Sequence, residues 1–349
     1  TGDTATVRAL WPALARTASH LDSLRMSRRT PQYRQPDSLL VFGLVPPSIS
    51  HEGYSAKPAY SFWDDFWGVR GMADAVLLAR LAGDARSAQR YAAASREFRD
   101  DVVAAVAQSM TVHHLSIIPG ASELGDVDPT STTIALDPAQ LLHALPDAAV
   151  RATFDRAWKS FIDRRDGVVK WDVYTPYEWR LVGSFIRLGQ PERALALVKW
   201  FLAARRPAAW HQWSEVVWRD ARAPRFIGDM PHGWVASDFI RATLDLIAYE
   251  READSALVVG AGIPYRWVND PRGVHVRMLQ TWWGELSLTT SANSNRVRLT
   301  IEWVRPPGGI ELHAPFGRAP TSVTVDGRTA RLDHNAVHLR GPGVVEFVY

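Results

Sequence analysis

A chain of 349 residues, of which 46% are hydrophobic and 22% charged, is long enough for two domains and has the composition of a globular protein. The absence of cysteine excludes disulfides, thiolate metal sites and a cysteine nucleophile. A net charge of +3 with scattered basic residues argues against a nucleic-acid-binding stripe, and no apolar run approaches the ~20 residues that a membrane helix needs. The composition leaves the oligomeric state open, as well as the choice between secretion and the cytoplasm.

The chain changes its hydrophobic pattern near residue 260. Long helices are predicted within 4–24, 59–83, 84–110, 147–165, 177–189, 191–206 and 233–252, and a short one within 131–145. From about residue 263, apolar residues alternate with period two in short segments separated by Gly, Pro, Asn and Asp, which is typical of an antiparallel β-sandwich. We therefore expect a multidomain protein, with a helical domain over 1–257 and a β-sandwich domain over 263–349.

Three connections in the helical half are unusually long, at 28–58, 117–133 and 206–232. Loops of this length without secondary structure are uncommon and usually functional. They contain or adjoin most of the polar and aromatic residues that stand out in the sequence.

The segment YSFWDDFWG, residues 60–68, places Asp64 and Asp65 between two tryptophans and two phenylalanines. A charge against apolar surface is costly unless it is paired or used. Glycoside hydrolysis uses one protonated carboxyl to give a proton to the leaving oxygen and one ionised carboxyl to activate water or attack the sugar. Glu215, enclosed by tryptophans in WHQWSEVVW, is the second candidate of this kind. The sequence therefore indicates Asp64, Asp65 and Glu215 as candidate catalytic residues.

Other residues near these acids in the sequence are expected to bind sugar hydroxyls or to stack on sugar rings. They are His51, Glu52, Trp63, Trp67, Glu123, Asp126, Tyr177, Glu178, Trp179, Trp213, Asp229, His232 and Trp234. There is no glycine-rich phosphate loop, no G-x-S-x-G elbow and no EF-hand loop, and the histidines are too isolated for zinc. We expect neither a metal nor a cofactor, and an oligo- or polysaccharide as the partner.

Other interpretations of these residues stay open. Asp64 or Asp65 could cap a helix, and Glu215 could pair with Arg219 or Arg222. A polysaccharide lyase needs a Tyr or His base, for which the candidates are Tyr54, Tyr60, Tyr177, His51 and His232. A carbohydrate-binding or scaffold domain without catalysis is a third possibility.

The motifs resemble those of the six-hairpin (α/α)6 glycosidases, which include glucoamylases and α-L-rhamnosidases. Trp63-Asp64-Asp65 is similar to the LWEE stretch that carries the general acid in glucoamylases, and Ser214-Glu215 to the SEQ stretch that carries the base. Other stretches, such as ISHEGYSAKPAYSFWDDFWGVRG, are similar to those of bacterial glycosidase-like proteins, and WWGELSL resembles the C-terminal domain of rhamnosidase-like enzymes.

The resemblance implies a helical toroid followed by a β-sandwich, and a glycoside hydrolase that inverts configuration. It implies Asp64 as acid, Asp65 in a supporting role and Glu215 as base. Asp64 is preferred to Asp65 because Gly68 and Gly71 below it are expected to leave room for a ligand. A full toroid has more hairpins than the predicted helices supply, so we expect the first hairpins to be missing. The three long loops are expected to share one rim.

Overall fold

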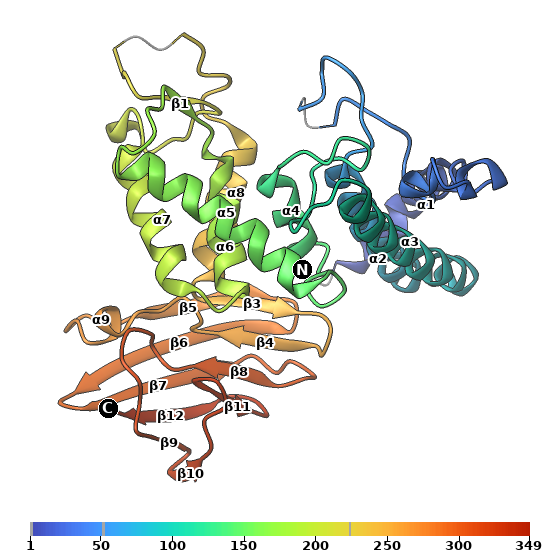
Figure 1. The fold of residues 1–349 in the computed structure, drawn as a ribbon. Coiled ribbons are helices and arrows are strands. Elements are labelled where there is room, and N and C mark those ends of the chain that lie inside the picture. Colours follow the sequence, from blue (N-terminus) through green and yellow to red (C-terminus); the bar gives the residue numbers. More distant parts are fainter. Residues whose placement is uncertain (1–2, 51–52, 223–224) are drawn as a thin grey trace. The chain divides into compact units, whose positions relative to one another are not determined.

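The computed structural model describes residues 3–50, 53–222 and 225–349. The chain divides into two compact units, one ending at Phe161 and the other beginning at Ile162 (Figure 1). The first unit contains α1 (Thr4–Met26), η1 (Pro31–Arg34), η2 (Leu39–Val41), α2 (Phe62–Ala82), α3 (Ala85–Val112), α4 (Pro129–Leu136) and most of α5 (Asp147–Arg165).

The helices α2 and α3 form a tight hairpin. Gly83 ends α2 in the left-handed conformation, with φ of 84°, and its N–H bonds back to the carbonyls of Ala79 and Arg80. Glycine suits this position because it has no Cβ to clash there. Asp84 then caps α3 by accepting the Ser87 N–H at 3.0 Å. The two residues between the helices thus reverse the chain and place α3 against α2.

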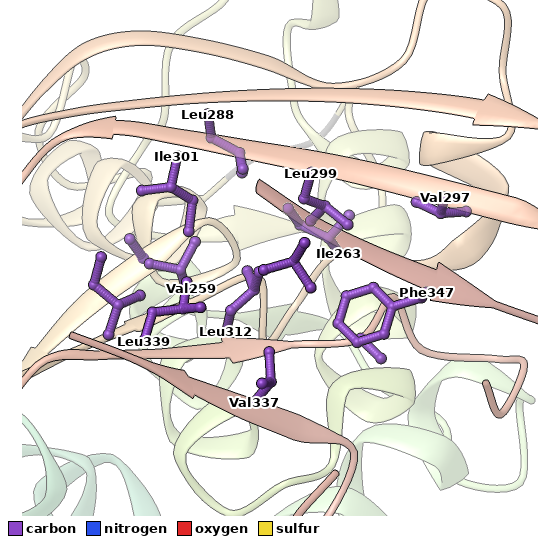
Figure 2. Packing of buried hydrophobic residues seen from close by; sticks show 14 of the residues in the cluster. Val259, Ile263, Leu288, Val297, Leu299, Ile301, Leu312, Val337, Leu339 and Phe347 are labelled. Carbon is purple, nitrogen blue, oxygen red and sulfur yellow. The ribbon is translucent and has the colours of Figure 1, made fainter. Parts of the chain in front are cut away.

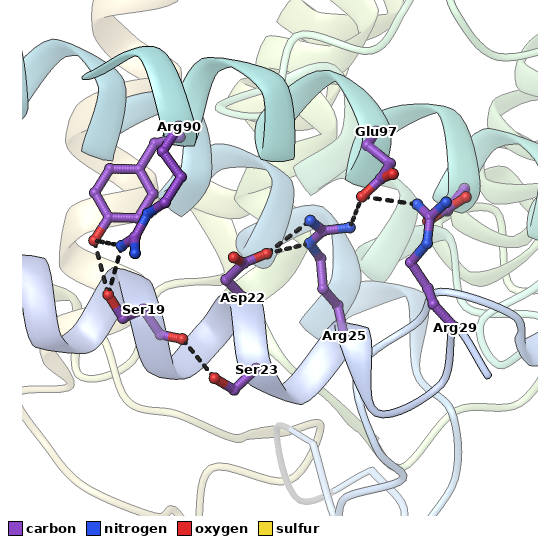
Figure 3. Close-up of polar contacts among 9 residues, drawn as sticks. Ser19, Asp22, Ser23, Arg25, Arg29, Arg90 and Glu97 are labelled. Atoms are coloured by element: carbon purple, nitrogen blue, oxygen red, sulfur yellow. Dashed lines mark hydrogen bonds and ion pairs between the residues drawn. The ribbon is translucent and has the colours of Figure 1, made fainter. Parts of the chain in front are cut away.

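A network of ion pairs joins α1 to α3 (Figure 3). Arg25, whose side chain is only 2% exposed, contacts Asp22 at 2.7 Å and Glu97 at 2.8 Å. Arg29 contacts Glu97 at 3.0 Å and Asp101 at 2.6 Å. Burial raises the pKa of Asp101 to about 6. Because the charges are matched and hydrogen-bonded, the guanidinium of Arg25 is tolerated between the helices.

The second unit begins in the last turn of α5 and contains helices first and strands later. Its helical elements are η3 (Pro176–Trp179), α6 (Arg180–Arg187), α7 (Pro191–Ala204), η4 (Ala208–Trp210), α8 (Gly233–Asp245) and α9 (Tyr265–Val268). Its strands are β1 (Val173–Tyr174), β2 (Val217–Trp218), β3 (Ala248–Arg251), β4 (Ala256–Val259), β5 (His275–Thr281), β6 (Gly284–Asn293), β7 (Arg296–Trp303), β8 (Ile310–His313), β9 (Ser322–Val325), β10 (Arg328–Ala330), β11 (Ala336–Leu339) and β12 (Gly343–Val348).

These strands form three sheets. β1 pairs with β2, six strands follow the antiparallel order β10-β9-β12-β7-β6-β5, and four follow the order β11-β8-β4-β3. In the four-stranded sheet only the β4–β8 pair is parallel. The period-two pattern aims alternate residues into a common core, which includes Leu288 of β6, Leu299 of β7 and Leu312 of β8, all at most 1% exposed (Figure 2).

The predicted fold class is confirmed, since helices dominate the earlier part of the chain and largely antiparallel strands the later part. The strands begin earlier than the expected residue 263, because β3 and β4 pair in the same sheet as β8 and β11. The division into domains at 257–263 stays a prediction. Within the described ranges, each helix is too short or too polar to cross a membrane.

Candidate active site

Asp64 lies in the first turn of α2, which begins after Ser61. The Ser48 hydroxyl donates to its Oδ2 at 2.6 Å, and the Ser50 hydroxyl to its Oδ1 at 3.1 Å. The two serines belong to the long loop before α2, which is fixed by the Ser48–Ala59 bridge. Asp64 is half-buried and held at both oxygens, so its position is well defined.

Asp65 has a different environment from its neighbour. It is 0% exposed, and its Oδ1 accepts the Val45 N–H at 2.9 Å. Its Oδ2 is buried and has no hydrogen-bond partner in the described part of the chain. Burial, and secondarily the charge of Asp64, raise the pKa of Asp65 well above its usual range, so this carboxyl is neutral over a wider range of pH. A carboxyl that is 0% exposed does not touch a substrate in this structure, so the supporting role is the prediction that stays open for Asp65.

The argument that favoured Asp64 is wrong in one respect. A Cβ placed on Gly68 would lie 2.7 Å from Phe98 Cε1, and one on Gly71 would lie 3.6 Å from Leu21 Cδ2. The face of α2 below Asp64 therefore packs on α1 and α3 and leaves no room for a ligand there. Asp64 remains the candidate because it is the more exposed of the two acids.

The loop with Glu123 and Asp126 also reaches the start of α2. Glu123 accepts the Tyr60 N–H at 3.0 and 3.2 Å, and Asp126 accepts the Tyr54 hydroxyl and the Ala121 N–H, both at 2.8 Å. Burial and the hydrogen bond to Asp126 raise the pKa of Tyr54. Both acids thus anchor backbone and side chains of the first unit, and the first two long loops meet here.

Two tryptophans of α2 flank this acid pair. Trp63 is 5% exposed, whereas Trp67 is 40% exposed, and their rings pack edge to face with centroids 6.0 Å apart. Only Trp67 offers a substantial aromatic surface to a ligand. His51 and Glu52, which were expected to bind substrate, lie outside the described residues.

Glu215 lies in the third long loop, in the second unit. Its N–H bonds to the Asp229 carbonyl at 3.2 Å, and Val216 N–H bonds to the Ile227 carbonyl at 3.1 Å, so residues 214–216 run beside 227–229. The carboxylate lies over Gly228, where a Cβ would come within 2.0 Å of Oε2. No hydrogen bond or ion pair reaches this carboxylate from residues 162–222 or 225–349, so the alternative pairing with an arginine is not found there.

Near Glu215 in the sequence, His232 joins the same loop to η3. Its ring Nε2 lies 2.6 Å from the Tyr177 hydroxyl. Its backbone N–H donates to the Trp213 carbonyl at 2.8 Å. The ring of Tyr177 also packs edge to face with Trp234, which is 54% exposed. Asp229 of the same loop is exposed.

Three residues expected to bind substrate make structural contacts within the second unit. Trp179 is 0% exposed and Trp213 4% exposed; their rings pack 5.3 Å apart, and Trp179 also packs against Phe201. Glu178 forms a two-point ion pair with Arg164, one bond of which is 2.7 Å long. The two enclosed rings and the paired carboxylate thus have structural partners, and their binding of a sugar stays a prediction.

Ser48 and Ser50 are the residues of this site that sequence reasoning missed. Serine is common in loops, and nothing in the pattern of residues 48–50 indicates a carboxylate partner 14 or 16 residues later. The contact arises only when the loop folds back along α2.

The comparisons with known proteins concern the fold. No family model matches the sequence, and no curated protein does either. The α-L-rhamnosidase from Dictyoglumus thermophilum matches 100% of this chain with a TM-score of 0.56 at 15% identity. The α-L-rhamnosidase from Streptomyces avermitilis, complexed with L-rhamnose, matches 82% of the chain with a TM-score of 0.47 at 16% identity. This chain spans 38% and 26% of the length of these two proteins.

The first of these likenesses confirms the suspected resemblance at the level of the fold, a helical domain followed by a β domain. These structural neighbours are glycoside hydrolases. Their low identity to this chain transfers no residue role to it.

Proposed function

We propose that this chain belongs to a glycoside hydrolase that acts on an oligo- or polysaccharide. The observation that carries the proposal is the likeness of the fold to a rhamnosidase over 100% of the chain. Because that neighbour is an α-L-rhamnosidase, α-L-rhamnosides are the first substrates to test. The site residues of each unit add support, since each unit presents a carboxylate and an exposed aromatic ring.

We assign the proton-donating role to Asp64. A serine hydroxyl can donate to a carboxylate and can equally accept from a carboxylic acid. Ser48 and Ser50 can therefore hold Asp64 in both protonation states, which a general acid must adopt in each cycle. Burial raises the pKa of the neighbouring Asp65, which favours its neutral form and so disfavours a second charge beside Asp64.

We assign the general-base role to Glu215. Its carboxylate is half-buried and unpaired among the described residues of its unit, so its oxygens are available to a water molecule. With one acid and one base the reaction inverts the anomeric configuration. Trp67 and Trp234, exposed in their respective units, are the proposed stacking surfaces for sugar rings.

The proposal is tested by sugar release from a panel of aryl glycosides and natural oligosaccharides, led by α-L-rhamnosides. Asp64→Asn is compared with Asp37→Asn, and Glu215→Gln with Glu302→Gln, because both controls alter exposed carboxylates. The site variants should lose activity by about 10²–10⁴-fold, the range for general acid–base catalysis, and the controls should not. Equal activity in the site and control variants would refute the assignment.

The leaving group separates the two roles. A general acid matters little when the leaving group departs without a proton, so Asp64→Asn should keep more activity on activated aryl glycosides than on natural ones. Glu215→Gln should lose activity on both kinds of substrate. The reverse pattern would exchange the roles of the two residues. Sugar binding without turnover in the unaltered chain would favour a binding domain instead.

One observation favours a polysaccharide lyase as a second candidate. The Tyr177 hydroxyl lies 2.6 Å from His232 Nε2, an arrangement in which histidine can take the tyrosine proton. A lyase releases unsaturated products that absorb in the ultraviolet. Such absorbance from a uronate polysaccharide, lost in Tyr177→Phe, would support this candidate, and its absence would exclude it.

A further inference from the structure

The β region contains an open pocket of about 530 Å³, formed by α9 and the turn that leads into β5. In Figure 1, α9 lies at the edge of the sheets, next to β6. All of its lining residues lie between 266 and 275, far in the sequence from Asp64 and Glu215. The volume is within the range of small-ligand sites, about 300–1,000 Å³.

The turn that forms the pocket wall is held by hydrogen bonds of its own backbone and side chains. Gly273 N–H bonds to the Asp270 carbonyl at 2.8 Å, and Arg272 N–H to Asp270 Oδ1 at 3.0 Å. Gly273 has φ of +62°, and a Cβ there would lie 2.7 Å from the carbonyl oxygen of Thr290. The backbone on either side is tied to buried Thr290, whose hydroxyl accepts the Val274 N–H at 2.7 Å. Binding here would therefore cost little ordering of the backbone.

The charges of the pocket do not cancel. Asp270 is neutralised by Arg272, whose Nε lies 2.9 Å from Oδ1. Arg266 is exposed, and no hydrogen bond or ion pair reaches its guanidinium from the described residues of this unit. His275 Nε2 lies 2.7 Å from the Arg272 carbonyl, which can only accept, so Nε2 carries the proton of this hydrogen bond. One uncompensated cation thus remains at the pocket.

Trp267 supplies the aromatic part of the pocket. It is half-buried, with one part packed against the sandwich core and the remainder lining the pocket. A partly exposed tryptophan offers a flat apolar surface of the kind on which a sugar ring stacks. A guanidinium matches a planar carboxylate in geometry and charge.

From this combination we infer that the pocket between α9 and β5 binds a sugar residue that carries a carboxylate. Trp267 stacks on the ring and Arg266 pairs with the acid group. The site holds a polysaccharide chain at the β region and takes no part in bond cleavage. It stands on its own geometry and does not depend on the chain being a hydrolase.

Calorimetry with trigalacturonate as the probe tests the inference, using the intact chain. Its carboxyl-reduced, neutral counterpart and inorganic phosphate are the comparison ligands. The acidic trisaccharide should bind at least about tenfold more tightly than the neutral one, and high salt should weaken it. Arg266→Ala should weaken binding about tenfold. Arg277→Ala, which alters an exposed arginine of β5 outside the pocket, should not.

Three results would overturn the inference: no binding, equal effects of the two arginine variants, or phosphate competing as well as the trisaccharide. The last would mean that charge alone is recognised. Hydrolysis of a small aryl glycoside provides an independent readout, because Arg266→Ala should leave it unchanged. Loss of that activity with binding intact would place Arg266 in the catalytic site and contradict the separate role.

Discussion

Replacing Asp65 with asparagine removes a titratable proton from the interior and keeps nearly the same shape. The amide oxygen can still accept the Val45 N–H that now bonds to Oδ1 at 2.9 Å. The amide nitrogen takes the place of Oδ2, which is already without a partner among the described residues. At acidic pH, where the carboxyl is neutral in both folded and unfolded chains, the two proteins should therefore differ little in stability.

The difference should grow as the pH rises. The pKa of Asp65 is raised in the folded state, so above its unfolded value of about 3.9 the folded chain keeps a proton that the unfolded chain has lost. With one proton bound when folded and none when unfolded, wild-type stability falls by about 1.4 kcal/mol per pH unit from this group. Asp65→Asn has no carboxyl at this position and does not lose stability in this way. In the wild type the loss ends once the pH passes the folded pKa of Asp65.

Urea unfolding of both proteins at several pH values measures the difference directly, because all other titrating groups are common to them. Above the unfolded pKa of about 3.9 the advantage of Asp65→Asn should increase with pH, by at most about 1.4 kcal/mol per pH unit, until the pH passes the raised folded pKa. Asp65→Ala is the matched variant that also lacks the proton but leaves the buried Val45 N–H unpaired, at a cost of about 1–3 kcal/mol. A difference in the free energy of unfolding between wild type and Asp65→Asn that is independent of pH would refute the inference that burial raises the pKa of Asp65.

Two other substitutions test contacts in separate units. Arg25→Ala should lower the free energy of unfolding by about 3 kcal/mol. This is near the lower end for a broken buried ion pair, because the partner Glu97 is 44% exposed. A loss below about 1 kcal/mol in urea unfolding would contradict this prediction. Gly228→Ala should reduce kcat/KM at least about tenfold, since its Cβ would displace the Glu215 carboxylate. Gly167→Ala is the control, with φ of +74° but open space around it; equal activity of the two variants would show that the Glu215 position is unimportant.

Much of the fold could be predicted because local signals agree with the final structure. Gly83 and Asp84 mark the end of one helix and the start of the next, and each does so through its own backbone or side-chain bonds. The period-two pattern after residue 263 corresponds to strands with one face in the core. The strand β3, with the sequence AYER, was missed because it continues the helical pattern that precedes it. It and β4 belong to a sheet only through the pairing of β4 with the distant β8.

The candidate site was less predictable, because the environment of each acid comes from tertiary contacts. The spacing of Asp64 and Asp65 indicates that only one can face outward. Which partners they have depends on Ser48, Ser50 and Val45, which lie in a loop without a regular pattern. Likewise, composition cannot tell a tryptophan that stacks on sugar from one that fills the core.

The anomeric configuration of the first product tests the central claim most directly. Proton NMR during hydrolysis of the best substrate of the panel records which anomer appears before mutarotation. The account predicts a hydrolysed sugar whose anomeric configuration is opposite to that of the substrate. A product of the same configuration would contradict the acid–base pair of Asp64 and Glu215. An unsaturated product, or binding with no product at all, would contradict glycoside hydrolysis itself.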